Sequence, residues 1–207
     1  MEDSRKTQND PSWNPLGFKY SADWYANKYH WNPPEDQMKD PGPGQYKERD
    51  TACILAMEIK EGDSILIPGC SEANNISLLK SMYRNLRITG VDWSATAIRF
   101  CRQAFPEFTF IHSNVSELDL PIESFDRILA IDFTEHLSLD DYFTFINMSY
   151  MFIRPDGTLG ILPGMSVRPE HINLMYPPTI AQHIEQHGFE TIAVGPQWVI
   201  GKKPKGR

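Results

Sequence analysis

The chain has 207 residues and a net charge of −7, from 20 lysines and arginines against 27 aspartates and glutamates. This length suits one domain with an ordinary hydrophobic core. The acidic charge argues against a protein that coats nucleic acid or anionic membranes, and no apolar run is long enough to span a bilayer. Three cysteines without metal-ligand spacing indicate a reducing compartment, so we expect a cytoplasmic protein with no nucleic-acid or membrane partner.

Three regions divide the chain. Residues 1–46 are rich in proline and aromatic side chains and have no long periodic apolar run. Residues 47–203 alternate between short apolar runs and amphipathic segments, which is typical of a folded domain. Residues 204–207 form a short basic tail. The sequence therefore predicts one domain preceded by an appendage.

The predicted elements of the domain begin with a helix over 48–60, which carries Ala52, Leu55, Ala56 and Ile59 on its inner face. The later elements are strand 64–67, helix 76–83, strand 86–91, a helix that begins after Ser94, strand 108–111, strand 125–131, helix 139–153, strand 158–162, helix 179–186, and strands 189–194 and 198–200. Turn signals separate them.

Two of these turn signals carry most weight. Pro155-Asp156-Gly157 should stop the long helix, and Gly195-Pro196 should join the last two strands as a hairpin. Strands that alternate with helices predict a parallel sheet that is covered on both faces. We therefore expect an α/β fold: a doubly wound, seven-stranded, mostly parallel sheet with an antiparallel last strand, in a three-layer Rossmann-like sandwich.

Small and polar residues follow the first two predicted strands. Ligands of open α/β sheets bind at the carboxyl ends of the strands, so these positions are the candidate site. The turn at Gly69, Cys70 and Ser71 lets a ligand approach the backbone closely, in front of a helix N-terminus. Asp92 follows the second strand, where a carboxylate can accept both hydroxyl groups of a ribose. The pattern predicts a nucleoside-containing ligand.

The strand ends taken in order are DSILIPGCSEAN, ITGVDWSATAI, FTFIHSNVSELDLPIESFDRILAIDFTEHL and FIRPDGTLGI. This ordered set resembles the motifs of class I S-adenosylmethionine-dependent methyltransferases, in particular the small-molecule branch, over residues 48–203. The resemblance implies S-adenosyl-L-methionine as cofactor and S-adenosyl-L-homocysteine as product. It implies methyl transfer to an O, N or S atom of a small-molecule acceptor by direct in-line displacement.

The resemblance also implies roles for individual residues. The expected cofactor-binding residues are Gly69 under the methionine part, Cys70 and Ser71 beside it, Asp92 on the ribose, Trp93 on the adenine, Asn114 and Val115 at the adenine edge, Ile131 at the methyl-donor end, and Tyr20 and Trp24. The expected catalytic residues are His136, Asp132 and Tyr25, and the expected substrate-binding residues are His171, Met165 and Tyr29.

The aromatic residues of segment 1–46 suit an active-site lid. Aromatic side chains exclude water and can hold a sulfonium group by cation–π attraction. We expect this segment to close over the cofactor, with Tyr20, Trp24 and Tyr25 nearest to it.

Departures from the family pattern leave other functions open. Ile67 stands where the family has an acidic residue, and Ser71 and Ala73 replace its second and third glycines. A protein lysine methyltransferase and a non-catalytic binding or scaffold module on the same fold are the alternatives, followed by a nicotinamide-dependent dehydrogenase.

The sequence predicts no metal ion and leaves the oligomeric state open between monomer and homodimer. Metal-dependent catechol-type enzymes place two acids and an amide around a hard cation. Asp132, Asp140 and Asp141 do not form such a set convincingly.

Overall fold

Seven strands form a single sheet in the computed structural model, which describes residues 42, 44, 46–168 and 170–205. The strands are β1 (Ser64–Pro68), β2 (Arg87–Asp92), β3 (Thr109–His112), β4 (Phe125–Ile131), β5 (Ile153–Leu162), β6 (Glu190–Val194) and β7 (Val199–Lys202). The helices are α2 (Lys47–Ala56), α3 (Asn74–Met82), α4 (Ala95–Ala104), α5 (Leu139–Phe152) and α6 (Pro177–Gln186), with 3-10 turns η2 (Val115–Glu117) and η3 (Thr134–His136).

The strand order is β3-β2-β1-β4-β5-β7-β6. Pairs from β3 to β5 are parallel, and β7 runs antiparallel to both of its neighbours. The chain moves outward from β1 to β3 and then returns to β4 on the other side of β1. The predicted fold class, including the antiparallel last strand, is confirmed. This order also places the switch point, where ligands of such sheets bind, between β1 and β4.

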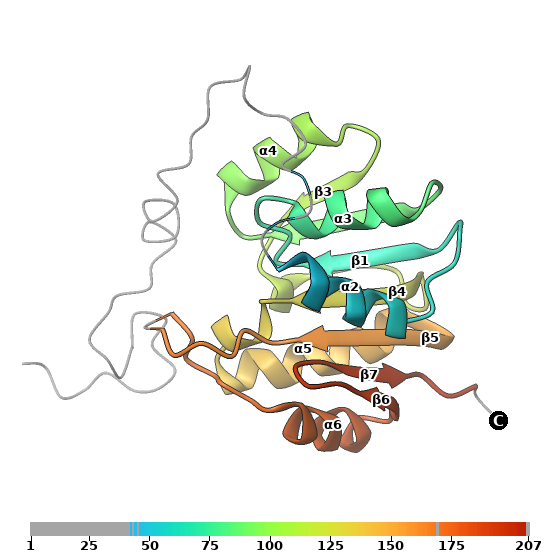
Figure 1. Cartoon of the computed structure of the whole chain (residues 1–207), viewed down its shortest axis with the longest axis vertical. Helices are drawn as coiled ribbons and strands as arrows, with labels where there is room; N and C mark the ends of the chain where they lie inside the picture. Colours follow the sequence, from blue (N-terminus) through green and yellow to red (C-terminus); the bar gives the residue numbers. More distant parts are fainter. Residues whose placement is uncertain (1–41, 43, 45, 169, 206–207) are drawn as a thin grey trace, which may run out of the picture.

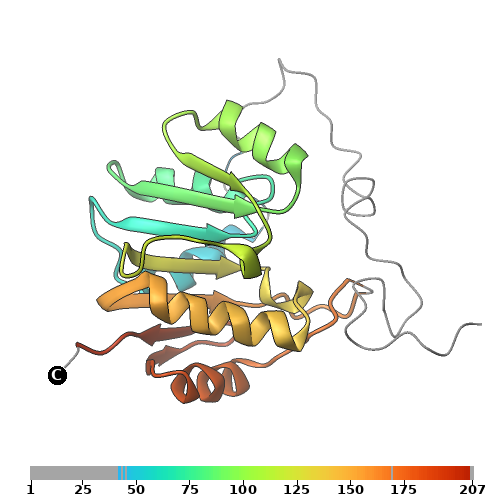
Figure 2. The same ribbon diagram turned by 180° about the vertical axis from the view of Figure 1, so that it is seen from behind.

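Helices cover both faces of the sheet, as Figures 1 and 2 show from opposite sides. Neighbouring strand residues point to opposite faces, so Ile65 and Ile67 join one hydrophobic core while Leu66 joins the other. Helices α2, α3 and α4 supply the first core, and α5 and α6 supply the second. Two separate cores on one sheet are the three-layer sandwich that the sequence predicts. No helix in the described ranges is long and apolar enough to cross a membrane.

The buried face of α2 differs from the predicted one. Ala52 is exposed and Leu55 is 60% exposed, whereas Asp50, Cys53 and Ile54 are buried. Cys53 and Ile54 pack in the hydrophobic core and so decide which face of α2 points toward the sheet. Asp50 lies on this buried face, although a polar residue is not expected there from the apolar pattern. The predicted inner stripe is therefore wrong at its first two positions.

Strand β5 begins five residues earlier than predicted. The segment Pro155-Asp156-Gly157 lies inside it, at a register shift between the pair Phe125↔Ile153 and the pair Arg127↔Thr158. Asp156 has a φ of 66°, which an irregularity in the strand accommodates. The turn residues thus mark a bulge in the strand rather than a connection to it. The predicted start of a helix after Ser94 is confirmed, since the Ser94 hydroxyl accepts the Ala97 amide and caps α4.

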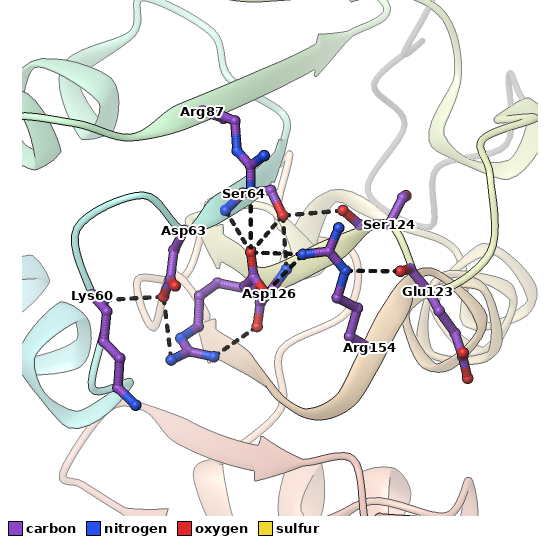
Figure 3. A network of polar contacts seen from close by, with 9 residues as sticks. Lys60, Asp63, Ser64, Arg87, Glu123, Ser124, Asp126 and Arg154 are labelled. Atoms are coloured by element: carbon purple, nitrogen blue, oxygen red, sulfur yellow. Dashed lines mark hydrogen bonds and ion pairs between the residues drawn. The ribbon is translucent and has the colours of Figure 1, made fainter.

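A polar network holds the amino ends of β1, β4 and β5 together, opposite the ends where the candidate site lies (Figure 3). The Asp126 carboxylate accepts hydrogen bonds from the Ser64 amide at 2.8 Å and the Ser64 hydroxyl at 2.7 Å. Both of its oxygens also lie about 3 Å from Nη1 of Arg154, at 3.0 and 3.1 Å. Burial acts to raise the pKa of Asp126, but these bonds outweigh it and hold the pKa below its ordinary value.

Replacing Asp126 with asparagine is expected to lower the free energy of unfolding at pH 7 by about 1–2 kcal/mol. Because the folded pKa is lowered, this stabilisation is present above the unfolded pKa of about 3.9 and is lost as the pH falls through the folded value. Urea unfolding between pH 7 and pH 2.5 should show the two proteins converging at the acid end. The exposed Asp119→Asn is the control, with an effect below about 0.5 kcal/mol.

Candidate functional site

The turn between β1 and α3 adopts left-handed backbone angles at three alternate positions. Gly69 has a φ of 63°, Ser71 of 43° and Ala73 of 60°. Only glycine adopts this region without cost, and other residues lose roughly 1–2 kcal/mol there. The turn therefore keeps the backbone shape of a three-glycine loop, although two of the glycines are replaced. A Cβ at Gly69 would also lie 2.6 Å from Cδ2 of Phe133, just after β4.

Asp92, the last residue of β2, ties this turn to the next one. Its Oδ2 accepts the amide N–H of Ser71 at 2.9 Å, and its Oδ1 accepts that of Ser94 at 2.8 Å. The residue is only 7% exposed, and burial raises its pKa although these backbone bonds oppose the shift. A carboxylate has about four lone-pair sites, so two further hydrogen bonds remain available to a ligand. The structure thus gives Asp92 a positioning task in addition to the predicted ribose contact.

Cys70 is buried in this turn. Its Sγ lies 3.9 Å from Sγ of Cys101 on α4, and the Cys101 thiol donates to the Ser71 carbonyl at 3.3 Å. The contact with the Cys101 thiol, followed by burial, raises the pKa of Cys70 well above its usual value, so the thiol is protonated. The Cys70 side chain packs in the core, and only its backbone is positioned to line the turn.

The ends of β2 and β3 carry the residues expected around adenine. Trp93 is 40% exposed, and the Nε2–H of His112 donates to its carbonyl at 2.8 Å. Asn114 is exposed, and its Oδ1 accepts the Ser116 amide at 3.2 Å, while Val115 is buried in the core. Asn114 therefore retains its amide nitrogen for a ligand. Their contacts with adenine remain predictions.

The end of β4 holds an ion pair that the sequence did not indicate. After the buried Ile131, Asp132 turns out of the strand with a φ of 47°. Its carboxylate receives a bidentate contact from Arg49 on α2, with Nη1–Oδ1 at 3.0 Å and Nη2–Oδ2 at 2.6 Å. Arg49 also contacts Asp50, with Nε–Oδ1 at 3.0 Å. An arginine beside an aspartate at the start of a helix looks like an exposed polar pair in sequence, and only the fold brings it to the site.

Next to this pair, η3 and the loop after β5 bring together three groups that can ionise. Glu135 is fully buried, and the His136 Nε2 lies 3.7 Å from its Oε1. The rings of His136 and His171 meet edge to face with centroids 4.9 Å apart. Burial, followed by the neighbouring His171, lowers the pKa of His136 to about 4, so its ring is neutral near pH 7. Burial raises the pKa of Glu135 to about 7, and the nearby amides of Glu135 and Gly164 offset this only in part.

The remaining predicted residues contribute less to this picture. Met165 follows β5 and is half-buried, and its contact with an acceptor stays a prediction. Tyr20, Trp24, Tyr25 and Tyr29 lie outside the described residues, as does nearly all of the segment 1–46 that we expect to form a lid.

Comparison with known proteins identifies the domain that carries this site. A family profile described as a methyltransferase domain matches residues 65–157, from the start of β1 to the middle of β5. The matched segment contains the glycine turn, Asp92 and the end of β4. Residues 65–157 are thus identified as a methyltransferase domain.

Two curated relatives match this methyltransferase domain at 26% and 27% identity. A Mycolicibacterium smegmatis protein named for S-adenosylmethionine-dependent methyltransferase activity is 26% identical over 139 residues, which cover 62% of this chain and 52% of the relative. Trans-aconitate 2-methyltransferase of Escherichia coli K12 is 27% identical over 126 residues, which cover 60% of this chain and 48% of the enzyme. The chain therefore matches about half the length of these relatives.

Solved structures share the fold of the methyltransferase domain at low identity. A chain from the complex of the Haloferax volcanii Trm112 methyltransferase activator with a methyltransferase has a TM-score of 0.70 at 11% identity, over 89% of this chain and 97% of that one. The 1,6-didemethyltoxoflavin-N1-methyltransferase of Burkholderia thailandensis, solved with its substrate and S-adenosylhomocysteine, has a TM-score of 0.66 at 17% identity, over 89% and 87%. At this identity the likeness establishes the fold alone.

Proposed function

We propose that the protein transfers a methyl group from S-adenosylmethionine to an O, N or S atom of a small molecule. The single observation that carries the proposal is the turn after β1, which keeps left-handed angles at Gly69, Ser71 and Ala73 and is held by Asp92. A strained backbone shape is retained only where the surrounding structure supports it, and such strain is concentrated at ligand sites. Here it lies at the switch point of the sheet, inside the segment that matches the family.

The residues present fit the cofactor in chemical type. The Asp92 oxygens that already accept one amide each can accept two ribose hydroxyl groups, and the exposed Trp93 offers an aromatic face to adenine. The absence of a side chain at Gly69 leaves the backbone open to the methionine part. The bound cofactor supplies an activated methyl group as a sulfonium. The protein then has to align the acceptor atom with the methyl carbon, which is a task of orientation.

A small-molecule acceptor is supported by the named relatives. The E. coli relative is named for trans-aconitate, and the B. thailandensis structure contains 1,6-didemethyltoxoflavin. We place the acceptor near the end of β4 and the loop after β5, where His171 and Met165 lie. His136 is neutral near pH 7 and can accept a proton, which a hydroxyl acceptor requires.

One structural neighbour favours a second candidate function. The solved structure of the [4+2]-cyclase SpnF has a TM-score of 0.66 at 14% identity, over 77% of this chain and 81% of that one. That protein is named a cyclase, so the fold also accommodates a reaction other than methyl transfer. A protein of this kind would bind the cofactor or a related ligand without transferring methyl groups.

Calorimetric titration with S-adenosylmethionine and S-adenosylhomocysteine tests the proposal. We expect the unaltered protein to bind with micromolar affinity. Trp93→Ala should bind about tenfold more weakly, because it removes the aromatic face proposed to pack on adenine. The Trp93 side chain is 40% exposed, so its removal should leave the hydrophobic core intact. Ile122→Ala, which removes another exposed apolar side chain, is the control with unchanged binding.

The two candidate functions differ in the second step of the test. Incubation with methyl-labelled cofactor and a panel of small acids, amines, phenols and thiols should yield labelled product under the methyltransferase proposal. Cofactor binding with no product from any acceptor class would favour the non-catalytic reading, and no cofactor binding at all would refute the proposal.

A further inference from the structure

We propose that Glu135, His136 and His171 form a binding site for a divalent first-row transition-metal ion such as Zn²⁺. One potential ligand atom from each residue lies within 4.8 Å of the other two. Ligand atoms around one tetrahedral zinc ion are about 3.3 Å apart, so modest side-chain rotations bring the three into range. This site goes beyond the proposed methyl transfer, and nothing in the family match assigns it.

Both histidines are oriented as metal ligands usually are. Nδ1 of His136 lies 3.1 Å from the Glu170 carbonyl, and Nδ1 of His171 lies 2.7 Å from the Ser166 carbonyl. A carbonyl oxygen only accepts hydrogen bonds, so each neutral ring carries its proton on Nδ1. The lone pair of each ring then lies on Nε2, and this is the tautomer in which a histidine binds a metal through Nε2. A backbone carbonyl on the other nitrogen is the usual partner that fixes a metal-binding histidine.

Glu135 supplies the negative charge. Its side chain is fully buried, and neither carboxylate oxygen accepts a hydrogen bond of good geometry among the described residues, although the amides of Glu135 and Gly164 lie near enough to favour the charged form. A buried polar group without a partner costs roughly 1–3 kcal/mol, and more when it is charged, so an unpartnered carboxylate needs a reason to be retained. A divalent cation between this carboxylate and the two imidazoles would provide the missing partner.

The backbone around the cluster leaves room for these groups only because of a glycine. A Cβ at Gly164, just after β5, would overlap with Oε1 of Glu135 and lie 3.0 Å from Cε1 of His171. The amide of Asn173 donates to the Glu135 carbonyl at 3.1 Å and so joins the loop after β5 to η3. The fold thus brings two segments 35 residues apart onto one small cradle.

The donor set selects the class of metal. Two imidazole nitrogens and one carboxylate oxygen suit zinc, cobalt and iron, whereas magnesium and calcium prefer oxygen ligands alone. Three protein ligands leave coordination positions for water or for an oxygen atom of an acceptor. This revises the expectation of no metal, which rested on the exposed or paired carboxylates Asp132, Asp140 and Asp141.

Titration of the metal-stripped full chain with Zn²⁺ and Co²⁺ tests the site without any methyl-transfer assay. We expect one ion per chain, visible absorption bands from bound Co²⁺, and a melting temperature that rises by roughly 5–10 °C at a metal concentration a hundredfold above Kd. Mg²⁺ at the same concentration should leave the melting temperature unchanged.

Matched variants assign the binding to this cluster. Glu135→Gln and His171→Gln should each weaken Zn²⁺ binding at least about 100-fold. Glu135→Gln has the same shape without the charge, so its metal-free form should melt no lower than the unaltered protein, which separates lost binding from lost folding. His187→Gln is the control with unchanged binding. Nδ1 of His187 also donates to a backbone carbonyl, that of His183 at 2.7 Å, but His187 follows the end of α6 and lies outside the cluster. No Zn²⁺ or Co²⁺ binding by the unaltered protein, or binding that survives both variants, would overturn the proposal.

Discussion

The Gly69→Ala variant is expected to bind S-adenosylmethionine at least about tenfold more weakly than the unaltered protein. Its free energy of unfolding should be lower by about 2–4 kcal/mol. Two costs add at this position. The φ of 63° is unfavourable for any L-residue with a side chain, and the new methyl group would lie 2.6 Å from the Phe133 ring. Because Phe133 follows β4, relief of this clash pushes apart the two strand ends that enclose the site. Calorimetry and urea unfolding measure the two effects.

Two further variants separate these costs. Gly62 has a φ of 87° but open space around its Cβ position, so Gly62→Ala incurs the backbone penalty alone, of about 1 kcal/mol, and retains cofactor binding. The double variant Gly69→Ala/Phe133→Leu should recover part of the lost stability, because a smaller side chain accommodates the methyl group. Equal stabilities for Gly69→Ala and Gly62→Ala would show that the contact with Phe133 does not matter.

Removal of the Asp92 carboxylate is expected to have a similarly large effect. In Asp92→Ala the buried amides of Ser71 and Ser94 lose their acceptors, so we expect the free energy of unfolding to fall by about 2–4 kcal/mol. Cofactor binding should weaken at least about 100-fold, because the predicted ribose contact and the anchor of the glycine turn would be lost together. Thermal unfolding and calorimetric titration test these two expectations.

Asp92→Asn distinguishes the two tasks of the carboxylate. One oxygen remains to accept an amide, so about half of the lost stability should return, while binding stays weak because the amide nitrogen cannot accept a ribose hydroxyl. Ser94→Ala is the control: it removes the N-cap of α4, costs about 1 kcal/mol of stability and leaves the cofactor contacts in place. An Asp92→Ala protein that binds the cofactor as tightly as the unaltered one would contradict the assigned role.

The match to the curated relatives covers only about half of each relative, so their substrates cannot be transferred to this chain. About half of the E. coli trans-aconitate enzyme lies outside the match, so its acceptor cannot be assigned to this chain from the match alone. The acceptor must therefore be found by experiment with this chain, and His171 and Met165 in the loop between β5 and α6 remain predicted acceptor contacts.

Most of the sheet was predictable from the sequence. Apolar runs such as residues 65–67 and turns such as the one at Gly69 are local signals. Burial on two faces requires continuous apolar residues, and a sharp turn requires small ones. The same locality explains why Asp92 and the N-cap Ser94 were found: each follows a strand end directly. The order of these signals was sufficient to indicate the methyltransferase fold.

Contacts between distant segments were decided by packing. Arg49 and Asp132 are 83 residues apart, and their pairing depends on how α2 is rotated, which the apolar stripe predicted wrongly at Ala52 and Leu55. Pairing with β4 also outweighs the turn propensity of Pro155-Asp156-Gly157. As a result, β5 begins at Ile153 and contains these residues in a bulge.

The cluster of Glu135, His136 and His171 shows the same division. The sequence places Glu135 and His136 in the short turn η3 that follows β4, and a histidine in the loop after β5, and each is unremarkable by itself. Their side chains meet because β4 and β5 are adjacent and parallel, so that the segments after both strands emerge at one edge of the sheet. Local sequence specifies which groups are available at a strand end, whereas the order of strands in the folded sheet specifies which of them share a site.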